Sequence, residues 1–113
     1  MDSRKRVLNY LGLARKAGKL SPGGFMTEKA VKGFRANLVL VSEEASGNTK
    51  KDFSSMCEYY KVPMYIFGDR DSLGRAIGRE SCTSLAVTDA GFAGQIISLL
   101  ETMQNGGSEY EGK

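Results

Sequence analysis

The sequence feature that most constrains the fold is an unbroken apolar run, Leu38–Val41. Leucine and valine in four consecutive positions are typical of a strand that is covered on both faces. Two further segments, 62–67 and 84–87, have the same short apolar character, and 19–21 could add an edge strand. A sheet built from such strands needs helices on both of its faces.

Between these segments, apolar residues recur at the three- and four-residue spacing of amphipathic helices. The spacing predicts helices over 3–18, over 48–60, in a basic segment that includes 25–34, in a short segment that ends at 78, and after residue 89. In this prediction Pro22 lies in the first turn of the second helix, and Met26, Ala30 and Phe34 form its core-facing stripe. Helices that alternate with two-sided strands predict a three-layer α/β/α sandwich with a small, mainly parallel sheet.

The distribution of charge is more informative than its sum, which is only +3 over 113 residues. Residues 1–35 carry nine basic and two acidic side chains, a net +7, whereas 86–113 carry one and four, a net −3. This asymmetry favours a localised basic surface, although solvated faces of ordinary helices would give the same pattern. The length suits a single folded domain, 1–104, and the glycine-rich acidic segment 105–113 predicts a disordered tail.

The chain offers few groups for catalysis or metal binding. It has no histidine, so the commonest general base is missing, and its two isolated cysteines cannot form a zinc site. Glu43 and Glu44 are adjacent at the end of a strand, where neighbouring side chains diverge, which favours capping or partner contacts over a paired site. We therefore expect no enzyme, no cofactor and no metal. The absence of a signal peptide or membrane span predicts a reduced, cytoplasmic protein that does not bind membranes.

A glycine-rich turn and a basic helix precede the central apolar run and suit a polyanion. Gly23 and Gly24 would offer free backbone N–H groups at a positive helix end. Phe25, Lys29 and Lys32 follow at spacings that place them on one helix face. Phe25 either stacks on an unpaired base or is buried in the core, and Lys29 either contacts phosphate or is simply solvated.

Several motifs, in their order and spacing, resemble those of the kink-turn RNA-binding ribosomal protein family, the L7Ae/L30e family, and its bacterial YlxQ-like branch. They are LGLARKAGKL at 11–20, Gly23 followed six residues later by Lys29 and Ala30, ANLVLVSEEAS at 36–46, NTKK at 48–51, CEYYKVP at 57–63, LGRAIG at 73–78 and LAVTDAGFA at 85–93. The resemblance implies a three-layer α/β/α sandwich around a small four-stranded mixed sheet.

In this family the RNA site lies at the start of the second helix and in the loop before the last strand. The resemblance therefore implies a site that includes Gly23, Gly24 and Lys29 on the helix, and Glu43 after the central strand. It also implies a specificity loop, which here consists of Arg79, Glu80, Ser81, Cys82 and Thr83.

The sequence departs from the family pattern at two positions of this site. Strong kink-turn binders carry Asn-Glu two and three residues after the glycine, where these side chains read sheared G·A pairs. Phe25 and Met26 stand there in this chain and cannot make those hydrogen bonds. We expect the loss to cost about 1–3 kcal/mol per contact with a kink-turn.

These observations predict a non-enzymatic RNA-binding protein, ribosomal or ribosome-associated, that engages structured, kink-turn-like RNA, with ribosomal proteins as possible further partners. The alternative is a protein-interaction or scaffold module on the same fold, for which Phe25 and Met26 would be an apolar contact patch. Exposure of both residues beside lysines is compatible with either function, whereas burial of both would remove the patch.

Overall fold

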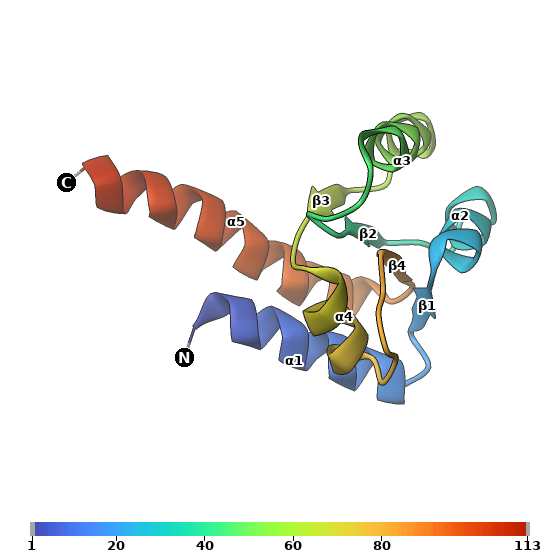
Figure 1. Ribbon diagram of the computed structural model, residues 1–113, viewed down its shortest axis with the longest axis horizontal. Coiled ribbons are helices and arrows are strands. Elements are labelled where there is room, and N and C mark those ends of the chain that lie inside the picture. The colour runs from blue at the N-terminus through green and yellow to red at the C-terminus, as the bar shows by residue number, and fades with distance from the viewer. Residues whose placement is uncertain (1, 113) are drawn as a thin grey trace.

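The computed structural model describes the backbone of residues 2–112 and the side chains of residues 2–103. Within this part of the chain, helices and short strands alternate (Figure 1). The elements are α1 (Ser3–Lys16), β1 (Leu20–Pro22), α2 (Gly24–Lys32), β2 (Leu38–Val41), α3 (Gly47–Tyr60), β3 (Met64–Ile66), α4 (Arg70–Ala76), β4 (Ser84–Val87) and α5 (Ala90–Gly112). The backbone of 105–112 continues α5, whereas the side chains of the predicted tail, 105–113, lie outside the described residues, so its disorder stays a prediction.

The four strands form one mixed sheet in the order β1-β4-β2-β3. Strand β2 is parallel to β3, whereas β4 is antiparallel to both β1 and β2. The mixed sheet implied by the family resemblance is therefore confirmed, and the mainly parallel sheet predicted from helix–strand alternation is wrong. The reason is that α4 does not carry the chain across the sheet. The backbone N–H of Cys82 donates to the carbonyl of Arg70 at 3.0 Å, so the segment between β3 and β4 starts and finishes at the same end of the strands.

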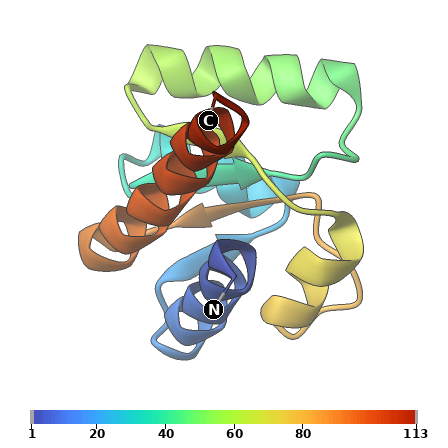
Figure 2. The ribbon, with the colours of Figure 1, turned by 90° about the vertical axis from the view of Figure 1, so that its left-hand side faces the viewer.

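The three-layer arrangement follows from the alternation of buried side chains along β2. Leu38 and Leu40 pack into a core with α1, α4 and α5, whereas Val39 and Val41 pack on the other face with α2 and α3. All four side chains are fully buried. Figure 2 shows α3 above the sheet and α1 and α4 below it. The predicted α/β/α sandwich and the two-sided central strand are thus confirmed.

The start and end of α2 differ from the prediction. Pro22 is the last residue of edge strand β1, where its missing N–H is tolerated, and the helix begins only at Gly24. Phe34 follows the C-cap and lies outside the helix, so helical spacing does not place it on the core, and it is 82% exposed. Met26 is 39% exposed. The buried face of α2 consists instead of Thr27, Ala30 and Val31.

None of the helices in the described part of the chain combines the length and the apolar character that crossing a lipid bilayer requires.

Candidate nucleic-acid interface

Three segments that are far apart in the sequence meet at one end of the sheet. The start of α2 is joined to β4 by a hydrogen bond from the N–H of Gly23 to the carbonyl of Ser84, at 2.7 Å. The end of β2 is joined to the loop 79–83 by a hydrogen bond from the N–H of Ser42 to the carbonyl of Thr83, at 2.8 Å. The predicted site residues therefore lie on neighbouring segments.

The first residue of this site, Gly23, has a φ of +94°, a conformation that favours glycine. Its carbonyl accepts hydrogen bonds from the backbone N–H of Thr27 at 2.8 Å and from Thr27 Oγ1 at 2.6 Å. The prediction that Gly23 offers a free N–H is wrong, because this N–H donates to the carbonyl of Ser84, the first residue of β4. Since no side chain caps α2, the first-turn amides of residues 24–26 are the donors that remain for a ligand.

The outer face of α2 carries an aromatic ring beside lysines. Phe25 is 76% exposed, so the alternative that it is buried in the core is wrong. Lys32 Nζ lies 2.8 Å from a carboxylate oxygen of Glu28, and this hydrogen bond raises the pKa of Lys32. Lys29 is exposed and takes no part in an ion pair within residues 2–103. Lys29 is therefore the cation on this face whose charge is available to a ligand.

The two adjacent glutamates lie in the turn after β2 and have different partners. Glu44 Oε1 accepts a hydrogen bond from the backbone N–H of Arg70 at 2.9 Å and lies 3.6 Å from Nε of the same arginine. Glu43 is exposed at the end of β2, and its carbonyl accepts a hydrogen bond from Lys50 Nζ at 2.9 Å. The side chains described in the structure do not bring three or more carboxylate or thiol groups to metal-binding distance.

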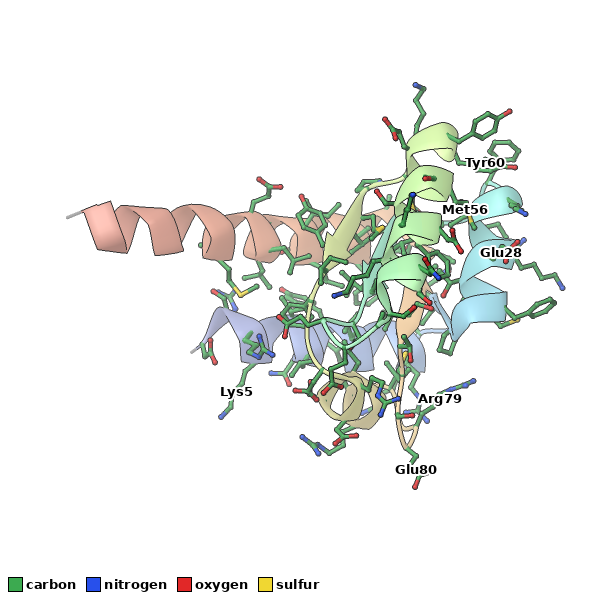
Figure 3. All side chains as sticks on the ribbon, turned by 45° about the horizontal axis from the view of Figure 1, so that its top comes forward. Lys5, Glu28, Met56, Tyr60, Arg79 and Glu80 are labelled. Carbon is green, nitrogen blue, oxygen red and sulfur yellow. The ribbon has the colours of Figure 1, made fainter. Side chains whose placement is uncertain are left out.

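The loop 79–83 presents polar side chains at its tip and a thiol at its base. Figure 3 shows Arg79 and Glu80 projecting outward from the tip, and Ser81 is exposed as well. Cys82 is only 4% exposed, and its thiol donates to the carbonyl of Ser84 at 3.2 Å. Cys82 therefore supports the loop from beneath, and the exposed surface belongs to the three residues before it.

A hollow of about 370 Å³ lies between α2 and α3 beside this loop. Gly24 and Thr83 line it together, so the start of α2 and the loop contribute to one concave surface. Figure 3 shows two of its other lining residues, Glu28 of α2 and Met56 of α3, on facing helices.

A glycine inside α4 fixes the loop, and sequence reasoning did not assign it this function. A Cβ atom on Gly74 would lie 2.6 Å from the Cα of Ser81 and 2.8 Å from the carbonyl oxygen of Arg79. The loop backbone therefore packs directly on the helix. The signal in the sequence was an isolated glycine within a helical pattern, which often marks a close backbone approach.

We expect both thiols to resist alkylation in the folded protein. Burial raises the pKa of Cys57 from 9.0 to about 11, and burial also raises the pKa of Cys82. Since the thiolate is the nucleophile, iodoacetamide at pH 8 should modify neither residue until urea unfolds the chain, as mass spectrometry would measure. Because the folded pKa of Cys57 lies above the unfolded value, its contribution to stability is present below pH 9 and falls between pH 9 and 11. Rapid modification of either thiol in the native protein would contradict this burial.

The fold and the site together define a class of protein. Its members are α/β/α sandwiches with a mixed sheet, in which a basic second helix without a side-chain cap lies beside the loop that precedes the last strand. The sequence profile of the ribosomal protein L7Ae/L30e/S12e/Gadd45 family matches residues 5–97, and the chain belongs to this family.

Two curated relatives share most of their length with this chain. It is 47% identical over 91 residues to the RNA-binding protein YlxQ of Bacillus subtilis (strain 168), which covers 80% of this chain and 91% of the relative. It is 32% identical over 99 residues to the RNA-binding protein YlxQ of Enterococcus faecium, which covers 88% and 95%. The family resemblance drawn from the motifs, including its YlxQ-like branch, is confirmed.

Two solved structures share the fold. A protein of unknown function from Bacillus halodurans superposes with a TM-score of 0.82 at 37% identity, over 84% of this chain and 96% of the other. The Giardia lamblia 15.5kD RNA binding protein superposes with a TM-score of 0.73 at 19% identity, over 88% and 91% of the two chains. At that identity the second comparison supports the fold alone.

Proposed function

We propose that this chain is a non-catalytic RNA-binding protein of the ribosomal or ribosome-associated type, which holds structured, kink-turn-like RNA between the start of α2 and the loop 79–83. The observation that carries the proposal is the exposed pair of Phe25 and Lys29 near an uncapped helix start, whose first residue Gly24 lines one hollow together with Thr83 of the loop. The two bacterial relatives are both named RNA-binding proteins, which supports the same class of partner.

Each part of the proposed site has a distinct physical function. The first-turn amides of α2 suit a phosphate, because they lack acceptors and lie at the positive end of the helix dipole. Lys29 and Arg79 add positive charge on either side. The ring of Phe25 offers a stacking surface to an unpaired base. Glu43, and Glu80 at the loop tip, are exposed acceptors suited to the amino groups of bases.

The same site predicts limited discrimination for a kink-turn. Phe25 and Met26 occupy the two positions where strong kink-turn binders carry Asn-Glu, and neither side chain can accept or donate the hydrogen bonds that read G·A pairs. Both are exposed at the helix start, so RNA binding here relies on stacking and phosphate contacts. We infer modest preference for a kink-turn over a plain duplex, together with strong salt dependence.

The exposure of Phe25 and Met26 equally favours one second function, a protein-interaction module with ribosomal proteins as partners. In that case the two side chains would form an apolar contact beside Lys29, and RNA would not compete for them. Affinity for RNA separates the two functions.

We expect Phe25→Ala to weaken RNA binding about 5- to 150-fold, the equivalent of about 1–3 kcal/mol for a lost stacking contact. Lys29→Ala should weaken binding to a kink-turn RNA and to a matched duplex alike. It should also lower the slope of log Kd against log salt by about 1, because one phosphate contact is lost. Fluorescence anisotropy over a salt titration measures both effects.

Lys5→Ala is the matched control, because Lys5 is an exposed lysine at the far end of α1 (Figure 3). Its Kd and salt slope should equal those of the unmodified protein. The proposal fails if the protein binds neither RNA at low salt, and that outcome would favour the protein-interaction function. It also fails if Phe25→Ala and Lys29→Ala bind as tightly as the Lys5→Ala control.

A further inference from the structure

A second hollow lies away from the start of α2, between α1 and α4. It has a volume of about 760 Å³ and is lined by ten residues, which include Gly12, Arg15, Lys16, Arg75, Ala76 and Gly78. We call it the α1–α4 groove. Close packing forms its floor, because a Cβ atom on Gly12 would lie only 3.2 Å from the carbonyl oxygen of Ala76.

The charge of this groove is entirely positive. Three of its lining residues, Arg15, Lys16 and Arg75, are cationic and exposed, and none of the ten is acidic. The side chains of these three residues form no ion pair and no hydrogen bond with any residue between 2 and 103. Three uncompensated cations around one hollow repel each other, and an anion that enters the groove removes this repulsion.

The groove leads directly into the loop of the proposed RNA site. A Cβ atom on Gly78 would lie 2.8 Å from the guanidinium carbon of Arg15, so this guanidinium lies against the turn where α4 ends. The next residue is Arg79, which begins the loop and is exposed. The cations of the groove are therefore followed by a further cation, Arg79, where the loop begins.

We propose that the α1–α4 groove is a second RNA-contact surface, which binds backbone phosphates of the helix that flanks the RNA element held by α2 and the loop. This inference rests on the proposed function and extends it to an RNA longer than the element itself. RNA is favoured as the occupant because an unpaired cationic surface without acceptors suits phosphates, and because the groove adjoins the loop that the proposed function assigns to RNA.

The last-turn positions of Arg15 and Lys16 on α1, and of Arg75 on α4, allow a simpler explanation, in which they only complement the helix dipoles. Complementing the helix dipoles would affect the stability of the fold but not the binding of RNA. Removing the charges would then lower the stability and leave both the affinity and its salt slope unchanged.

The test compares two RNAs: a kink-turn RNA with a full flanking helix, and the same RNA with this flank trimmed away. On the full RNA, the double variant Arg15→Gln/Arg75→Gln should bind roughly tenfold more weakly, with a salt slope lower by about 2, or about 0.9 for each lost phosphate contact. On the trimmed RNA, the variant and the unmodified protein should bind equally. Lys16→Gln, a single exposed change, should show the same dependence on the flank if the double variant does not fold.

The control is Lys5→Gln/Lys51→Gln, which removes two charges from exposed positions on α1 and α3 outside the groove. It should match the unmodified protein on both RNAs. If the groove variant and this control bind the full RNA equally tightly, the proposal is overturned. The groove would then suit an acidic protein partner instead. If Phe25→Ala still weakens binding in that case, the proposed function stands without the groove. If the unmodified protein binds neither RNA, the proposed function itself fails.

Discussion

Gly74→Ala should lower the free energy of unfolding by about 1–3 kcal/mol, although alanine ordinarily favours a helix over glycine. The added methyl would lie 2.6 Å from the Cα of Ser81 and 2.8 Å from its backbone nitrogen. These neighbours are backbone atoms of the loop, so no side chain can rotate away to make room. Either α4 or the loop must move, and urea unfolding measures the cost.

Gly94→Ala is the matched control, because it makes the same change inside α5, where the added methyl meets nothing within 4 Å beyond its chain neighbours and the helix's own backbone. It should stabilise the protein by about 0.5–1 kcal/mol, since alanine loses less backbone entropy than glycine in a helix. We therefore expect Gly74→Ala to lower the free energy of unfolding and Gly94→Ala to raise it. A stabilising or neutral Gly74→Ala would show that the loop yields at no cost and is not held by α4.

The same substitution tests whether the loop takes part in binding. A shift of the backbone at Arg79 and Ser81 moves the loop tip relative to the start of α2. Folded Gly74→Ala protein should therefore bind RNA more weakly than Gly94→Ala protein, even under conditions where both are fully folded. Equal affinities would remove the loop from the proposed interface and leave α2 as its main element.

The layers of the fold could be predicted from sequence because they depend on local pattern. The four consecutive buried residues of Leu38–Val41 require that both faces of the sheet be covered. The apolar residues at helical spacing predict the helices that cover them. Whether two strands are parallel or antiparallel depends instead on which end of the sheet the segment between them reaches. The antiparallel pairing of β4 with β2 follows from contacts such as that between Cys82 and Arg70, which no local pattern encodes.

The candidate site could be predicted in part for a similar reason. The spacing of Phe25 and Lys29 on one face depends on the helix alone, and the structure places both at the surface. The hydrogen bond that occupies the N–H of Gly23 and the function of Gly74 depend on β4 and the loop 79–83, which come later in the chain. The α1–α4 groove likewise forms only when two distant helices pack together.

Leu40→Ala should cost about 2–5 kcal/mol of unfolding free energy, because it removes a fully buried side chain from the central strand and leaves a cavity. Leu40 is paired with Leu85 on one side and with Tyr65 on the other, so the sheet cannot collapse into the space. Leu13→Ala makes the same chemical change at a leucine that is 51% exposed and should cost less than about 1 kcal/mol.

The size of the Leu40 effect matters because domains of this kind are stable by only about 5–15 kcal/mol in total. A loss at the upper end of the expected range would leave part of the Leu40→Ala protein unfolded at 37 °C, and the apparent affinity for RNA would fall with the folded fraction. The affinity of the folded fraction should not change, because Leu40 lies in the core that β2 shares with α1, α4 and α5, away from the surface of α2. Urea unfolding and anisotropy on the same samples separate the two quantities. A reduced affinity after correction for the folded fraction would mean that the packing of β2 positions the RNA site directly.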